Sequence, residues 1–245
     1  VSFFSKSDTE IVVFGDEKQN IYDRELDENK EIRVTGIVGQ WNRSLKKSFR
    51  FKHDIGKLAI EFQKEFLGDK YTLDEMLIAQ QEFDFDPSII EYHEIINLAE
   101  IKDIVFEFIQ LYNIHSNDVA ILGDNIGTLR ELDFEIRSEY QEDTITTFEM
   151  KEEYEELEKK MLLTKDNINQ IRRAKKVGFW LNAGMIKLST VHSFKGWEIH
   201  TLFLLIDEQS TFELVYTGIT RARQNIIIIN LGNTELSNFF SKNIQ

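Results

Sequence analysis

Residues 186–205 constrain the fold most, because they join two apolar runs through a polar loop. Ile186, Leu188 and Thr190 alternate with polar residues, which is the period-2 pattern of a half-buried strand. Residues 201–206 form a short apolar run of the kind that is buried in a parallel sheet. The loop between these strands carries polar side chains that serve a core poorly and a ligand well. On this chemistry alone, a binding loop and a plain connection are equally good interpretations.

Apolar strands and amphipathic helices alternate along the rest of the chain. Strands are predicted at residues 89–93 and 118–122, and a helix at 127–136. Another helix is expected to begin at Asn97, because Glu100 follows three residues later as in a capping box. This alternation predicts an α/β fold with a mostly parallel sheet flanked by helices.

Three further segments combine regular structure with polar groups. Residues 11–22, IVVFGDEKQNIY, form an apolar strand that runs into a polar turn. Residues 45–50, LKKSFR, lead into the helical pattern of residues 54–66, whereas residues 68–87 indicate an irregular loop. Residues 213–223, ELVYTGITRAR, predict a helix that ends in two arginines, followed by a strand at 225–229.

Taken in order, these segments carry GDxxQxIY, FR, TVHSxKGxE and YxGITRAR. That series resembles motifs III, IV, V and VI of the UvrD-like superfamily 1 DNA helicases. Four motifs in order are far more specific than any one alone. The resemblance implies a RecA-like fold, with residues 1–40 ending a first RecA-like domain and 41–245 forming the second. The charged segment at about 149–182 is then expected to be a reduced helical insertion.

The resemblance also implies roles for the residues of the first two motifs. Gln19 matches a glutamine that senses the nucleotide γ-phosphate, and Tyr22 matches a tyrosine that stacks on single-stranded DNA. Phe49 would stack on adenine in place of the commoner tyrosine, and Arg50 would reach the γ-phosphate. Without the family, Gln19 would be interpreted as solvated and Tyr22 as part of a core.

The later motifs imply the remaining candidates. Thr190 and His192 are assigned to DNA, and Lys195 to the coupling of DNA with nucleotide. Glu198 would accept a hydrogen bond from the ribose, and Arg221 would act as an arginine finger on the γ-phosphate. A finger of this kind stabilises charge that develops during phosphoryl transfer. Trp197 stands where the family usually has leucine.

Charge is distributed unevenly. The net charge of −14 argues against a general nucleic-acid binder, but residues 151–245 carry 13 basic against 11 acidic residues. The acidic excess lies in residues 1–150, with 32 acidic against 16 basic residues. The basic run at residues 172–176 is interpreted first as a solvated face and second as a contact with DNA phosphates.

The sequence contains no GxxxxGK[ST] phosphate loop and begins with valine. We therefore expect the chain to begin after the phosphate loop and magnesium-binding acids of a longer protein. ATP and Mg²⁺ are the expected cofactors of that protein, with no metal ligands in these residues, and single-stranded DNA and the missing N-terminal RecA-like domain are the expected partners. Absent cysteines and the lack of a long apolar run fit a cytoplasmic protein without a membrane partner.

The motif series favours the C-terminal part of an ATP-dependent DNA helicase or translocase that is inactive as an isolated piece. One alternative is a non-enzymatic interaction module that is derived from a helicase, which the acidic first half and the missing phosphate loop support. Another is the helicase-like domain of a recombination nuclease.

Overall fold

The computed structural model describes residues 19–22, 25, 47–48, 52–71, 73, 77–78 and 87–244. Its centre is a parallel six-stranded sheet in the order β3-β8-β7-β4-β6-β5. These strands are β3 (Ile90–Glu94), β4 (Val119–Gly123), β5 (Thr144–Thr146), β6 (Ile186–Thr190), β7 (Ile199–Asp207) and β8 (Ala222–Leu231). Two short strands, β1 (Lys47–Ser48) and β2 (Leu77–Ile78), pair separately in parallel.

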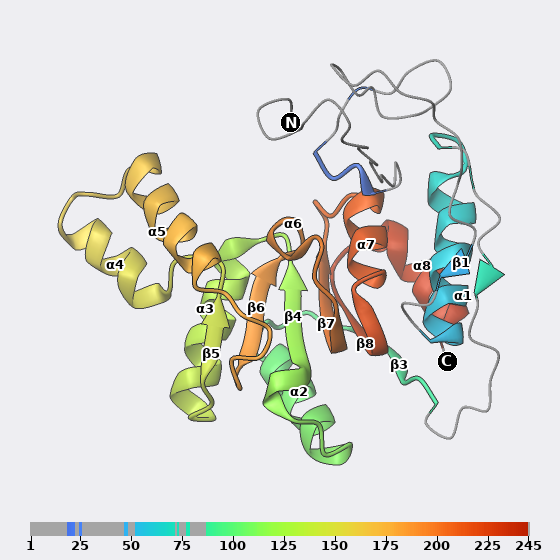
Figure 1. Cartoon of the computed structure of the whole chain (residues 1–245), viewed down its shortest axis with the longest axis horizontal. Coiled ribbons are helices and arrows are strands. Elements are labelled where there is room, and N and C mark those ends of the chain that lie inside the picture. Colours follow the sequence, from blue (N-terminus) through green and yellow to red (C-terminus); the bar gives the residue numbers. More distant parts are fainter. Residues whose placement is uncertain are drawn as a thin grey trace, which may run out of the picture.

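Helices cover both faces of the large sheet (Figure 1). They are α1 (His53–Phe62) with its π-helical continuation η2 (Gln63–Leu67), α2 (Glu100–Leu111), the 3₁₀ turn η3 (Ser116–Asp118), α3 (Ile126–Glu139), α4 (Lys151–Lys159), α5 (Lys165–Val177), α6 (Val191–Phe194), α7 (Phe212–Ile219) and α8 (Thr234–Asn243). The α/β prediction with a parallel sheet flanked by helices is therefore confirmed.

Alternation along the strands divides the core into two layers. Ala120, Leu122 and Leu204 pack with α1, α7 and α8 on one face, whereas Ile121 and Phe203 pack with α2 and α3 on the other. Both faces of the central strands are thus apolar, which is expected for a parallel sheet.

Three local predictions need correction. The β6 strand is buried along its whole length rather than half-buried, because β4 and β5 flank it and helices cover both faces. Helix α2 begins at Glu100 with Ala99 as its N-cap, and the Asn97 side chain accepts from the Ala99 N–H instead of closing a capping box. Helix α7 ends at Ile219 and β8 begins at Ala222, so Arg221 lies in the intervening turn.

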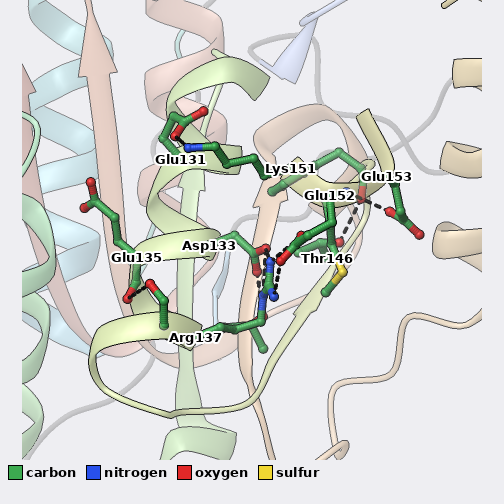
Figure 2. Close-up of polar contacts among 12 residues, drawn as sticks. Glu131, Asp133, Glu135, Arg137, Thr146, Lys151, Glu152 and Glu153 are labelled. Carbon is green, nitrogen blue, oxygen red and sulfur yellow. Dashed lines mark hydrogen bonds and ion pairs between the residues drawn. The ribbon is translucent and has the colours of Figure 1, made fainter. Parts of the chain in front are cut away.

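The expected helical insertion is the pair α4 and α5, which stands at the β5 end of the sheet (Figure 1). Figure 2 shows how α4 is attached to α3: Arg137 donates to buried Asp133 at 2.9 Å and to both oxygens of Glu152, also at 2.9 Å. Thr144 of β5 donates to the other Asp133 oxygen at 2.6 Å. Ionic contacts thus join the insertion to the edge of the domain.

The irregular loop predicted at residues 68–87 contains β2, and most of its other residues lie outside the described part of the chain. The expected domain boundary near residue 40 also lies outside it.

Among the described residues, no helix is both long and apolar enough to span a membrane.

Candidate nucleotide-sensing and nucleic-acid site

Gln19 is the point where three of the sequence motifs meet. The Arg221 Nη2 atom donates to Gln19 Oε1 at 3.1 Å, although the two residues are 202 positions apart. The Lys195 Nζ atom donates to the Gln19 carbonyl oxygen at 2.8 Å. The structure therefore brings together Gln19, Lys195 and Arg221, which sequence analysis assigned to one nucleotide-coupled site.

Arg221 is held firmly by its neighbours. Its side chain is 3% exposed, and its Nε donates to the Thr217 carbonyl at 3.1 Å. Nη1 donates to the Trp197 carbonyl at 3.4 Å, and Nη2 also donates to Thr220 Oγ1 at 3.0 Å. Together with the Gln19 bond, these contacts with oxygen atoms orient the guanidinium. A fixed guanidinium of this kind suits the recognition of a phosphate oxygen.

His192 joins the residue 19–22 segment to the sheet. Its Nε2 lies 3.0 Å from the Ile21 carbonyl oxygen, and its Nδ1 lies 3.4 Å from Asp124 Oδ1. A carbonyl and a carboxylate only accept hydrogen bonds, so the doubly protonated ring satisfies both contacts. The bond with Asp124 raises the pKa of His192; burial opposes this shift, and the Ile21 carbonyl adds to it.

Tyr22 presents an aromatic face beside this histidine. Its side chain is 58% exposed, and its ring meets His192 edge-on at a centroid distance of 5.5 Å. Lys195 Nζ lies 5.8 Å from the centre of the Tyr22 ring. An exposed ring next to cationic groups is the arrangement on which single-stranded bases stack. The structure thus excludes the simple interpretation that Tyr22 caps a core.

The other predicted residues differ in what the structure shows. Thr190 ends β6 and caps α6, since its Oγ1 accepts from the Ser193 N–H at 3.2 Å. Glu198 is half-buried just before β7, next to the carbonyl that accepts from Arg221. The ligand roles of these two residues stay predictions. Phe49 and Arg50 lie outside the described residues.

A cavity of about 240 Å³ is lined by residues that the sequence did not place together. Asp124 follows β4, Thr147 follows β5, Ser193 lies on α6, and Arg172 and Lys176 come from α5. Ligands of parallel α/β sheets bind at the carboxyl ends of strands, and this rule was a usable signal for Asp124. Arg172 and Lys176 belong to the basic run for which a contact with DNA phosphates was the second interpretation, and their position beside this cavity depends on how the insertion packs.

Comparison with known proteins adds little to this geometry. No protein-family model matches the sequence, and no curated protein matches it. Among solved structures, the chain is similar to the crystal structure of the C-terminal domain of a possible DNA helicase from Lactobacillus plantarum WCFS1, with a TM-score of 0.45 and 13% identity. The likeness covers 76% of this chain and 88% of that chain, and it does not extend to the roles of particular side chains.

Proposed function

We propose that this chain is the C-terminal part of an ATP-dependent, UvrD-like DNA helicase or translocase, and that it supplies nucleotide-sensing and single-stranded DNA contacts. The observation that carries this proposal is the hydrogen bond between Arg221 and Gln19, at 3.1 Å. It unites the first and last motifs of the helicase-like series around a buried, oriented cation. Tyr22 lies at the other end of the same short segment, where His192 of α6 contacts it, and this end would face DNA.

The geometry suggests how nucleotide and DNA would be coupled. Gln19 accepts from Arg221, and a phosphate oxygen that took this place would release the Gln19 side chain. Ile21 and Tyr22 follow directly and contact His192, so a shift at Gln19 is transmitted to the ring that stacks on DNA. Binding energy gained at one end of the segment can thereby change the affinity at the other end.

ATP and Mg²⁺ would be cofactors of the longer protein. Bound ATP supplies the phosphoryl group, and Arg221 and Gln19 would hold its γ-phosphate from this side. Within the described residues, no three metal-ligating side chains gather into a metal site. The magnesium ligands and the phosphate loop would therefore come from the N-terminal RecA-like domain, and we expect the isolated chain to hydrolyse no ATP.

The decisive experiment measures ATP hydrolysis by the polypeptide in which a phosphate-loop domain precedes these residues. Turnover should require Mg²⁺, should rise with single-stranded DNA, and should fall about 10³-fold or more in Arg221→Ala. Arg223→Ala is the matched control, because Arg223 is exposed and lies two positions away. Equal turnover in the two variants, or DNA-stimulated turnover by the isolated chain, would refute the assignment. If the longer protein binds no DNA, the interaction-module alternative takes its place.

A further inference from the structure

The 240 Å³ cavity described above adjoins the site through His192. His192 lines it and also contacts Ile21 and Tyr22, so the cavity and the exposed ring share one side chain. Its walls come from the carboxyl ends of β4, β5 and β6 and from one side of α5. A strand that stacked on Tyr22 would thus have the cavity beside its next backbone groups.

Among the charged side chains that line the cavity, one cation, Lys176, is not in an ion pair with a described residue. Asp124 is paired with His192 at 3.4 Å. Arg172 is paired with buried Glu149, to which its Nε donates at 2.7 Å and its Nη2 at 2.9 Å. Lys176 is exposed and has no ion-pair partner among the residues that the structure describes. Asp124, the acidic residue in the cavity lining, is paired with His192, and Glu149 is shared by Arg130 and Arg172, so the charge of Lys176 is not offset and the cavity is net positive.

Two other residues that line the cavity also carry hydrogen-bond donors. The Ser193 hydroxyl accepts from Thr190 Oγ1 at 3.0 Å, and its own proton remains available for a ligand. The Nη1 group of Arg172 is the guanidinium nitrogen that Glu149 does not engage. A cation with two further donors matches the oxygen atoms of a phosphate. Because 240 Å³ is smaller than the roughly 300–1,000 Å³ of ordinary small-molecule sites, the cavity suits a phosphate group better than a whole nucleotide.

We propose that Lys176, with Ser193 and the free edge of Arg172, binds one backbone phosphate of the single strand whose base stacks on Tyr22. The inference rests on the proposed function, since it names a contact on the same DNA path. It also distinguishes two members of the basic run: Lys176 would offer its whole ammonium group, whereas Arg172 is held by Glu149 and would offer only Nη1.

The test uses the full chain, a fluorescein-labelled oligothymidylate and fluorescence anisotropy over a series of salt concentrations. Each phosphate contact adds about 0.7 to the slope of log affinity against log salt for a single strand. Lys176→Ala should therefore lower that slope by about 0.7, so that the affinity ratio of wild type to variant falls about 2.6-fold when salt is raised fourfold. Lys176→Arg keeps the charge and should keep the slope.

Arg173→Ala is the matched control, because Arg173 is an exposed cation on the same helix that does not line the cavity. Its slope should equal that of wild type, and circular dichroism should show all variants folded. If wild type binds the oligonucleotide but Lys176→Ala and Arg173→Ala have the same slope, the phosphate contact is wrong while the proposed function stands. If wild type binds no single strand at low salt, the phosphate contact is wrong, and the proposed function fails as well if the longer polypeptide also binds none.

A free phosphate ion would use the same chemistry. Replacing chloride by inorganic phosphate at equal ionic strength should change the melting temperature of wild type and of Lys176→Ala equally if the site belongs to DNA. A stabilisation by phosphate that Lys176→Ala abolishes, combined with an unchanged slope for DNA, would assign the cavity to the free ion and overturn the DNA contact.

Discussion

Glu149 offers the sharpest test of how the helical insertion is attached. It directly precedes Met150 and α4, and its side chain is fully buried. Arg130 of α3 donates to it at 2.8 Å, and Arg172 of α5 donates at 2.7 and 2.9 Å. One carboxylate therefore connects three helical segments. Glu149→Gln keeps the size of this side chain but removes its charge, so it isolates the ionic contribution.

The expected loss follows from burial and partner geometry. A glutamine keeps one acceptor oxygen, while its amide nitrogen can only donate and cannot receive a guanidinium hydrogen bond. Removing one partner from a buried ion pair costs about 3–5 kcal/mol. The Arg130 and Arg172 side chains are 13% and 30% exposed, so water can solvate part of what they lose. We therefore expect the low end, about 3 kcal/mol, or a melting temperature about 6–12 °C lower.

Urea denaturation followed by circular dichroism measures this loss in the free energy of unfolding. Glu156→Gln is the control, because Glu156 lies on α4, is 63% exposed and pairs with Lys160 one turn away. Exposed pairs of this type contribute less than about 1 kcal/mol. If Glu149→Gln costs no more than Glu156→Gln, the carboxylate does not anchor the insertion and the reasoning is wrong.

The same variant gives a pH test. Burial would raise the pKa of Glu149, but the hydrogen bonds from Arg172, with the backbone and the charge of Arg130, outweigh it and lower the pKa. A lowered carboxyl pKa stabilises the fold at pH values above about 4.3, the usual value for glutamate, and this contribution is lost as pH falls through the folded-state pKa. The stability difference between wild type and Glu149→Gln should thus be constant near neutrality and shrink in acid. A difference that grew in acid would contradict this.

Two further changes test the core and the site. Gly218→Ala would place a Cβ 2.6 Å from a methyl group of buried Leu204. We therefore expect urea denaturation to show a loss of about 1–3 kcal/mol in the free energy of unfolding. A neutral result would show that α7 can move away from the sheet. His192 has a raised pKa because of Asp124, so its stabilising bonds are complete below about pH 6.5 and are lost as pH rises through the folded-state pKa. The stability advantage of wild type over His192→Gln should therefore decrease with rising pH, and an advantage that increased would refute the doubly protonated ring.

The sequence predicted the fold well because its central strands are continuous apolar runs. Residues 118–122 and 201–206 are continuous apolar runs, and they form the adjacent strands β4 and β7. Amphipathic spacing likewise placed α3 within a few residues of its ends. Errors arose where long-range packing decides, as at the end of α7, where the chain turns into β8 three residues earlier than the pattern indicated.

Lys187 shows what the pattern could not provide. In the sequence it is the polar partner of an alternating strand, yet its side chain is fully buried and donates to the backbone and side-chain oxygens of Asn117. Burial lowers its pKa to about 8, against a smaller opposing effect of Asp118. A lysine that points inward is identifiable only when the acceptor that receives it is known, and here that acceptor is 70 residues away.

In the candidate site too, some residues were predictable from the sequence and others were not. Motif order was enough to place Gln19, His192, Lys195 and Arg221 together, because each stands at a fixed offset within its own motif. Asp124 belongs to none of the four motifs, and its pairing with His192 depends on the neighbouring positions of β4 and β6 in the sheet. Strand order is a tertiary property, so the sequence alone gave no partner for the histidine.

The basic run at residues 172–176 illustrates why charge alone is ambiguous. Its members differ in their surroundings: Arg172 is bound by Glu149, Lys175 is paired with Glu153 at 3.2 Å, and Lys176 lines the cavity. Because Glu149 is buried and also bound to α3, it fixes the α5 helix relative to the sheet. The buried contacts of Glu149 therefore place Lys176 in the same cavity lining as His192. The insertion thus acts as a wall of the candidate DNA site, and loosening it through Glu149 should weaken DNA binding as well as stability.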